Sequence, residues 1–303
     1  MTAASFTNSL AAMGSREFKL FRELIHRETG IWLRDGKQAM LASRLSKRLR
    51  HLGMTSFADY YSYVGRTAGR AEELGELINC VTTNKTSFFR ENHHFDLLAE
   101  TVVPEIQQAA LRGAARSVRI WSAACSTGQE PYSIAITLLE SLRAARPTGA
   151  PGSEIAAPPG WEVELVASDI DTAVLATGAR GVYEDDALES VPQHWRKKYF
   201  LRGTGSMLGR IRVKPELARL VEFKRINLMD KVWPVEGPFD AIFLRNALIY
   251  FDRQTQEIFL RRMVRLLRPR GYLFIGHSEH VPWLHDVVTP LNNTVYRRKE
   301  GPN

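Results

Sequence analysis

Cysteines and long apolar runs are both scarce in this chain of 303 residues. The two cysteines, Cys80 and Cys125, are too few for a disulfide framework or a thiolate metal cage. No apolar run reaches the length of a membrane-spanning helix, and residues 1–18 lack the charged start and apolar centre of a signal peptide. We therefore expect a cytoplasmic protein with no metal and no direct membrane insertion.

Glycine is also scarce where a nucleotide-binding fingerprint needs it. Residues 118–135, VRIWSAACSTGQEPYSIA, pass from a β-rich apolar run through small residues into a helix that starts near Pro131. This order is typical of a nucleotide-binding α/β unit, in which the backbone approaches the ligand and the helix offers free N–H groups. Only Gly128 stands where a dinucleotide fingerprint has three glycines, so the signal alone is moderate.

Strands and helices alternate beyond this stretch. We predict strands over residues 161–167, 238–246 and 271–275, and a helix over 254–267. This pattern indicates an α/β fold with a doubly wound, mostly parallel sheet, which binds ligands at the carboxyl ends of its strands. Polar residues fall at those ends: residues 126–130, Asp169 and the pair Arg245 and Asn246. Asp169 suits a ribose, whereas Asp171 suits the cap of the next helix.

We predict helices over residues 15–30, 37–52, 56–64 and 70–81. The second of these helices contains no acidic residue. Its basic side chains therefore have no acid to pair with inside the helix. With a net charge of +8, this favours a docking surface for an acidic partner, formed by Arg44, Lys47, Arg48 and Arg50. The plain alternative is a solvated helix face. We assign residues 1–91 to a helical docking domain and 92–303 to an α/β domain.

Two segments break the alternation of strands and helices. Residues 198–215 contain two β-rich runs separated by glycines, which predicts an inserted antiparallel hairpin. Residues 286–299 suit an antiparallel pair that closes the sheet. A parallel sheet with such an ending is the architecture of S-adenosylmethionine-dependent methyltransferases rather than of dehydrogenases. Residues 146–160, rich in Pro, Gly and Ala, are expected to form a surface loop.

The polar segment 82–90, TTNKTSFFR, is either a capped loop between domains or a strap whose arginine holds a carboxylate. The neighbouring His93 and His94 cannot share a helix face, and no nearby Cys or carboxylate set completes a metal site. We assign this histidine pair to surface or packing roles.

Seven motifs occur in order along the chain. They are TTNKTSFFRE (82–91), WSAACSTGQEPYSIA (121–135), ASDID (167–171), YFLRGTG (199–205), INL (226–228), RNALIYF (245–251) and GHSE (276–279). Together they resemble the bacterial chemotaxis receptor methyltransferases, which are protein-glutamate O-methyltransferases. The resemblance extends from about Phe18 to Tyr296.

The resemblance implies a set of contacts to the cofactor S-adenosylmethionine. They are made by Asn84, Thr86, Arg90, Glu130, Asp169, Asn227, Leu228, Arg245 and Asn246. It also implies that Tyr250 lies beside the transferred methyl group, so Tyr250 and Arg245 are the catalytic candidates. The chain departs from the family at Gln129, where a second glutamate is frequent.

The resemblance implies partners as well. The family's substrates are acid-rich helical bundles in the cytoplasmic part of receptors, which fits the basic helix. The hairpin resembles an inserted β-subdomain that in some members binds a short peptide at the receptor C-terminus. A nucleic-acid methyltransferase is the first alternative, but residues 245–250 lack the Asn/Asp-Pro-Pro-aromatic turn of base methylases. A non-enzymatic receptor-binding adaptor, the second alternative, would not need the cofactor residues.

Overall fold

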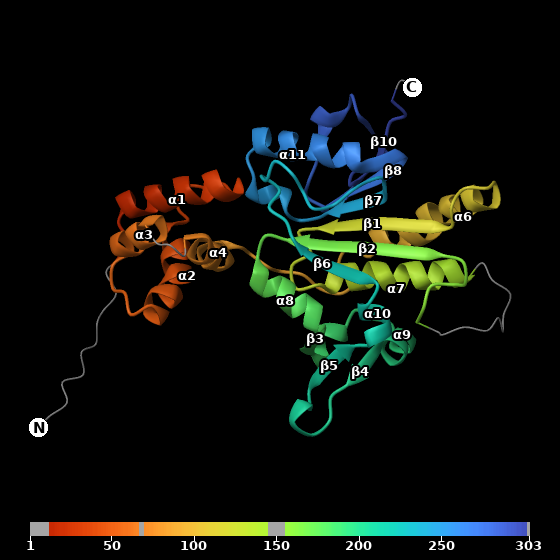
Figure 1. Ribbon diagram of the computed structural model, residues 1–303, viewed down its shortest axis with the longest axis horizontal. Coiled ribbons are helices and arrows are strands. Elements are labelled where there is room, and N and C mark those ends of the chain that lie inside the picture. Colours follow the sequence, from red (N-terminus) through yellow and green to blue (C-terminus); the bar gives the residue numbers. More distant parts are fainter. Residues whose placement is uncertain (1–11, 67–69, 145–154, 302–303) are drawn as a thin grey trace, which may run out of the picture. The chain divides into compact units, whose positions relative to one another are not determined.

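The helical and the α/β parts of the chain form separate units in the computed structural model (Figure 1). The structure describes residues 12–66, 70–144 and 155–301. The first unit comprises Met1–Thr83 and Tyr250–Asp252, and the second comprises Asn84–Ile249 and Arg253–Asn303. Residues 84–90 of the strap therefore group with the α/β unit, whereas the boundary predicted from the sequence lies after residue 91. No helix among the described residues is long and apolar enough to cross a membrane.

The first unit is built from amphipathic helices whose apolar faces meet in one core. They are α1 (Ser15–Thr29), α2 (Gln38–His51), α3 (Phe57–Arg66) and α4 (Arg70–Val81). Leu41, Leu45 and Leu49 recur at every fourth position of α2 and are fully buried. Gly30 ends α1 in the left-handed region, with φ of 73°. The predicted helices are confirmed to within two residues at each end.

The second unit contains a seven-stranded sheet with the order β6-β2-β1-β7-β8-β10-β9. The strands are β1 (Ser117–Ala123), β2 (Glu162–Asp169), β6 (Val221–Arg225), β7 (Phe239–Leu244), β8 (Leu267–Ile275), β9 (Val288–Pro290) and β10 (Val295–Arg298). The pairs from β6 to β8 are parallel, and β10 is antiparallel to both β8 and β9. The predicted α/β class and the antiparallel closing pair are confirmed.

Helices connect these strands, with α7 and α11 on opposite faces of the sheet in Figure 1. They are α5 (His93–Leu97), α6 (Val103–Leu111), α7 (Gln129–Ala144), α8 (Thr172–Arg180), α9 (Gln193–Tyr199), α10 (Pro215–Ala218) and α11 (Arg253–Leu266). A π-helical turn, Leu98–Val102, links α5 to α6, so the helical hydrogen-bond pattern changes directly before Pro104, which has no N–H to donate. Most of the predicted loop 146–160 lies outside the described residues.

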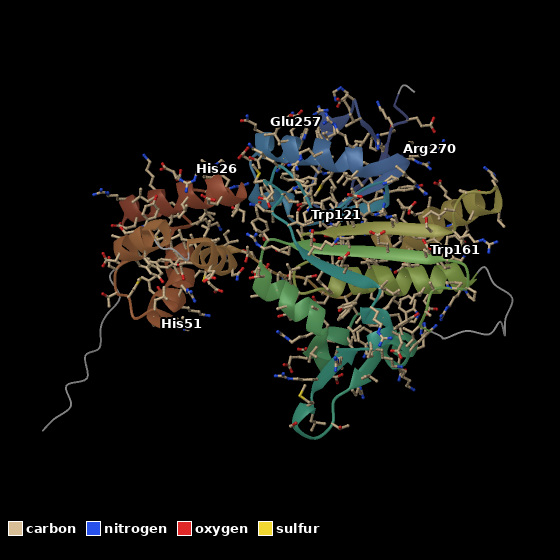
Figure 2. The ribbon with its side chains drawn as sticks, viewed as in Figure 1. His26, His51, Trp121, Trp161, Glu257 and Arg270 are labelled. Atoms are coloured by element: carbon tan, nitrogen blue, oxygen red, sulfur yellow. The ribbon has the colours of Figure 1, made fainter. Side chains whose placement is uncertain are left out.

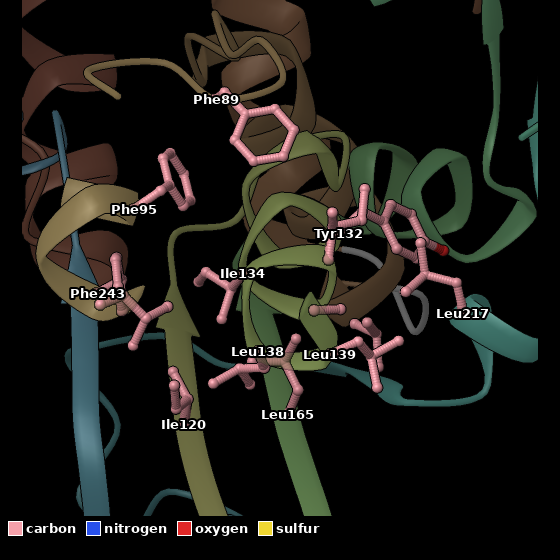
Figure 3. Close-up of a cluster of buried hydrophobic side chains, with 14 of the residues drawn as sticks. Phe89, Phe95, Ile120, Tyr132, Ile134, Leu138, Leu139, Leu165, Leu217 and Phe243 are labelled. Atoms are coloured by element: carbon pink, nitrogen blue, oxygen red, sulfur yellow. The ribbon is translucent and has the colours of Figure 1, made fainter. Parts of the chain in front are cut away.

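The core of the second unit fills the space between the sheet and α7. Figure 3 shows Ile134, Leu138 and Leu139 of α7 facing Ile120 of β1 and Leu165 of β2. At roughly 1.5–3 kcal/mol for each fully buried aliphatic side chain, this packing stabilises the sheet edge that carries the site. On β1, Trp121 is also fully buried (labelled in Figure 2), and its indole N–H donates to the Ser168 hydroxyl at 2.8 Å.

The predicted insert is present, but it is a three-stranded sheet rather than a two-stranded hairpin. Its order is β3 (Val182–Glu184), β5 (Arg210–Val213) and β4 (Phe200–Arg202), with antiparallel pairing throughout. The β4–β5 hairpin is confirmed, and β3 is the strand that the prediction missed. Because β5 is central, β4 pairs on one side only within this sheet.

Candidate active site

The turn after β1 holds its backbone in the left-handed region at Ala124, Ser126 and Gly128, where φ is 59°, 52° and 94°. A Cβ on Gly128 would lie 2.9 Å from the Cα of Gly178, so close backbone approach as well as φ requires glycine there. The Ser126 hydroxyl is buried and finds no hydrogen-bond partner within the described residues. The turn is therefore compact and offers one buried hydroxyl to a ligand.

Two acids at the end of β2 have different surroundings. Asp169 is buried, and its two carboxylate oxygens accept backbone N–H groups of Ser126 at 2.9 Å and Asp171 at 3.0 Å. Burial raises the pKa of Asp169. Asp171 caps α8 by accepting from the backbone N–H groups of residues 173 and 174, as predicted, and it also accepts from the Asn84 amide at 2.8 Å. Asn84 of the strap therefore lies at the end of β2.

Arg245 is enclosed at the end of β7, with 1% of its side chain exposed. Its guanidinium donates to Glu130 at 2.9 Å, to Glu91 at 3.1 Å and to the carbonyl of Arg90. The Ser122 hydroxyl donates to the other oxygen of Glu130 at 2.7 Å. Two carboxylates around one guanidinium leave a formal charge of −1, which favours a cationic group nearby.

Glu91 joins the strap to the end of β7. It accepts from the Asn246 amide at 3.0 Å and from the backbone N–H of His277 at 3.1 Å. Burial alone would raise the pKa of Glu91, but the Asn246 hydrogen bond and the charge of Arg245 outweigh burial and lower it. Although Glu91 ends the first of the seven motifs, it is missing from the predicted site.

Glu279 is a second carboxylate that the prediction missed, and it fixes the loop after β7. Its two oxygens accept from the backbone N–H groups of Gly276 at 2.6 Å, Leu248 at 2.8 Å and Asn246 at 3.0 Å. Burial raises its pKa. Asn246 itself has φ of 58°, so Glu279 stabilises a backbone conformation that few residues adopt. The available signal was the fourth residue of the GHSE motif.

The remaining predicted residues lie on the strap and after β6. The side chains of Phe88 and Phe89 are buried, whereas Thr86 and Arg90 of the strap are half-buried. The Arg90 guanidinium donates to the carbonyl of Lys85 at 2.8 Å. Asn227 and Leu228 are buried at the end of β6. The N–H of the preceding residue, 226, donates to the Asp169 carbonyl at 3.0 Å, so this turn lies beside Asp169.

The structure therefore gathers the predicted residues of the second unit into two groups. Asn84, Asp169 and Asn227 lie at the ends of β2 and β6, and Glu130, Arg245 and Asn246 lie between β1 and β7. Tyr250 belongs to the first unit, where its carbonyl accepts from the N–H of Trp32 at 2.7 Å.

The four predicted docking residues on α2 differ in exposure. Arg48 forms a two-point ion pair with Glu73 of α4, at 3.0 and 2.6 Å, and Arg44 donates to the carbonyl of Val81 and to Thr83. The sequence lacks acids only inside this helix, and the acid that pairs with Arg48 comes from α4. Lys47 and Arg50 are exposed.

Cys125 and His94 have surroundings that fit structural roles. Cys125 is buried, and burial raises the pKa of its thiol well above the ordinary value, so a nucleophilic thiolate is disfavoured. His94 is buried against Phe274, and its Nε2 lies 2.9 Å from the Thr294 hydroxyl. Among the described residues, no group of three His, Cys, Asp or Glu side chains could hold a metal ion.

A sheet of this order, with an antiparallel strand inserted beside its last parallel strand and acids at the strand ends, defines an S-adenosylmethionine-dependent methyltransferase. Two family descriptions match the chain: "CheR methyltransferase, SAM binding domain" over residues 84–297, and "CheR methyltransferase, all-alpha domain" over residues 16–82. The chain therefore belongs to the CheR family of chemotaxis protein methyltransferases, as the motifs predicted.

Relatives of known name agree with this assignment. The chain is 46% identical to chemotaxis protein methyltransferase 2 of Pseudomonas aeruginosa, over 92% of both chains. It is 43% identical to the chemotaxis protein methyltransferase of Escherichia coli and 44% identical to that of Salmonella typhimurium, in both cases over 94% of this chain and 91% of the relative. The enzyme class and the S-adenosylmethionine cofactor are thus confirmed. Neither alternative, a nucleic-acid methyltransferase or a non-enzymatic adaptor, is supported.

Proposed function

We propose that this enzyme esterifies glutamate side chains of chemotaxis receptors with the methyl group of S-adenosylmethionine. The observation that carries the proposal is the net negative group formed by Glu91, Glu130 and Arg245, together with the buried acid Asp169. The cofactor combines a ribose with an ammonium and a sulfonium. The ribose hydroxyls match Asp169 at the end of β2, and the cationic groups match the net negative group between β1 and β7.

Each part of the site has a proposed role toward the cofactor. Asp169 accepts the ribose hydroxyls, Glu130 faces the ammonium of the methionyl group, and Arg90 faces its carboxylate. Asn84, Thr86, Asn227, Leu228 and Asn246 complete the contacts. Because the guanidinium of Arg245 is enclosed by Glu130 and Glu91, we propose that Arg245 positions these two acids.

The chemistry needs little from the protein beyond placement. The cofactor's sulfonium supplies an electrophilic methyl group, and a glutamate carboxylate is already ionised at pH 7. No general base or covalent nucleophile is required. The protein therefore contributes mainly orientation, an effect worth up to roughly 7–11 kcal/mol. Tyr250 is proposed to lie beside the methyl group and to orient the attacking carboxylate.

The test is the transfer of radiolabelled methyl from S-adenosylmethionine to receptor-rich membranes, followed by mild alkali. We expect label on receptor protein that is released as methanol, because carboxyl esters hydrolyse readily under these conditions. Label that resists alkali, or that enters nucleic acid, would contradict the proposal.

Replacement of Asp169 by Asn is expected to weaken S-adenosylmethionine binding at least tenfold. An amide keeps the shape but removes one of the two acceptor oxygens that the buried carboxylate uses. Calorimetric titration measures the dissociation constant. Asp186→Asn, at an exposed acid of the same unit, is the matched control. Equal affinities of the Asp169 variant and the wild type would remove Asp169 from the cofactor site.

We propose that the basic surface of α2 docks the acid-rich receptor bundle through Lys47 and Arg50. Reversal of both charges (Lys47→Glu with Arg50→Glu) is expected to raise the KM for receptor about tenfold at low salt, with less effect at high salt. Arg16→Glu with Lys19→Glu makes the same charge change on the exposed side of α1. A rise in the cofactor dissociation constant as large as the rise in KM would contradict the assignment.

We also propose that the free edge of β4 binds a short peptide at the receptor C-terminus by strand addition. Gly203 N–H donates to the Arg210 carbonyl, and the Tyr199 carbonyl accepts from Lys214, so residues 199, 201 and 203 face the neighbouring strand. The N–H of Arg202 therefore faces outward. Leu201 and Leu208 are exposed, which gives the peptide apolar contacts.

Calorimetry with an acidic C-terminal pentapeptide that contains an aromatic residue tests this tether. Arg202→Pro removes the outward N–H and leaves the β4–β5 ladder intact, so it is expected to abolish binding. Arg202→Ala keeps the N–H but loses the charge, and is expected to retain weakened binding. Equal binding by the proline variant and the wild type would exclude strand addition at β4.

A further inference from the structure

The segment Tyr250–Asp252 is bound to the helical unit at each of its three residues. The carbonyl of Tyr250 accepts from the N–H of Trp32 at 2.7 Å, and Phe251 forms an antiparallel bridge with Ile31. The carboxylate of Asp252 lies 2.9 Å from Nε2 of His26. Three consecutive residues are thus fixed by two elements, the end of α1 and the loop that follows it.

The loop that receives the segment is itself rigidly held. Thr29 donates its hydroxyl to the carbonyl of Ile25 at 2.6 Å and accepts from the N–H of Ile31 at 3.0 Å. Gly30 turns the chain in the left-handed region directly after α1. The Ile31 and Trp32 backbone therefore has a defined position relative to α1.

His26, labelled in Figure 2, connects this loop to Asp252. Its ring packs edge-to-face against Trp32, with ring centroids 5.1 Å apart. The guanidinium of Arg22, one turn earlier on α1, lies over the ring of Trp32, 5.6 Å from the ring centroid. It also pairs with Asp35 at 2.6 Å. His26 thus contacts both the residue that holds Tyr250 and the residue that ends the segment.

We infer that His26 and Asp252 are positioning residues that fix Tyr250 for methyl transfer. The inference rests on the proposed role of Tyr250 and extends it, since it assigns the placement of the tyrosine to the helical unit. His26 and Asp252 are each 36% exposed, so their pair contributes little to global stability. Misplacement of a reacting group by about 1 Å can nevertheless lower a rate up to about a hundredfold.

The inference predicts a selective loss of turnover. His26→Ala in the full-length enzyme is expected to lower kcat about tenfold at saturating cofactor, and to change the KM for receptor and the cofactor dissociation constant less than twofold. Asp252→Ala should have the same effect, and the double variant should be no worse than either single variant, because both remove one contact. His26→Gln keeps a side-chain donor and should recover most of the turnover.

The controls separate positioning from a loss of structure and from a failure of the proposed function. Arg27→Ala removes an ion pair with Glu28 on the same helix and should leave kcat unchanged. Full turnover in Tyr250→Phe would contradict the proposed role of the tyrosine itself. A slow Tyr250→Phe enzyme beside fully active His26→Ala and Asp252→Ala enzymes would overturn the positioning inference alone. If His26→Ala and His26→Gln lower kcat to the same extent and also lower the melting temperature to the same extent, the contact is a structural one and the positioning inference is overturned.

Discussion

Replacement of Arg245 by Met is expected to lower the free energy of unfolding of the α/β unit by about 3–5 kcal/mol. The guanidinium bonds to Glu91 and Glu130 and to the carbonyl of Arg90, and its side chain is 1% exposed. Its removal leaves two carboxylates close together without their cation. Urea unfolding at pH 7, monitored through a probe of the α/β unit, measures the loss.

Arg245→Met is also expected to weaken S-adenosylmethionine binding, because Glu130 loses the contact that orients it. Combining Arg245→Met with Glu91→Gln and Glu130→Gln removes the uncompensated charges, so it should recover most of the stability but none of the affinity. Arg265→Met, at an exposed arginine of α11, is the matched control and should change neither quantity. An Arg245→Met enzyme with wild-type stability would show that the two acids do not depend on the guanidinium.

The role of Arg245 marks a limit of prediction from the sequence. The apolar strands and the polar residues that follow them indicate where Glu130, Asp169 and Arg245 meet, because parallel strands end at the same edge of the sheet. The hydrogen-bond partner of each acid comes from a distant segment of the chain: Glu91 lies 154 residues from Arg245, and Glu279 lies 33 residues from Asn246. No local pattern contains those pairings, so the prediction includes neither Glu91 nor Glu279.

The same limit applies to the helical unit and to the insert. The absence of acids from residues 37–52 was informative only within that helix, whereas Arg48 is paired by Glu73 from α4. In the insert, the glycines between β4 and β5 mark a turn between two nearby β-rich runs, and this turn predicts the hairpin. β3 is as short as β4 but lies far from β5 in the sequence, so no turn signal connects it to its partner strand.

Acid is expected to destabilise the α/β unit through His94. Its ring is fully buried, and burial, with the nearby charge of Arg245, lowers its pKa from 6.5 to about 3. The unfolded chain therefore binds a proton below pH 6.5 that the folded chain accepts only near pH 3. His94 therefore leaves the free energy of unfolding unchanged above pH 6.5. Below pH 6.5 it lowers this free energy by up to about 1.4 kcal/mol per pH unit, which amounts to about 3 kcal/mol at pH 4.

The contribution of His94 can be isolated as the difference between wild type and His94→Gln. Glutamine does not titrate and keeps a polar group for Thr294, so the difference in unfolding free energy should narrow as the pH falls from 6.5 to 4. The subtraction matters because burial raises the pKa of Asp169 and Glu279, and these acids favour the folded state as they take up protons. His194→Gln, at an exposed histidine of the same unit, should follow the wild-type profile. A constant difference between His94→Gln and wild type across this range would mean that His94 takes up its proton equally well in the folded chain.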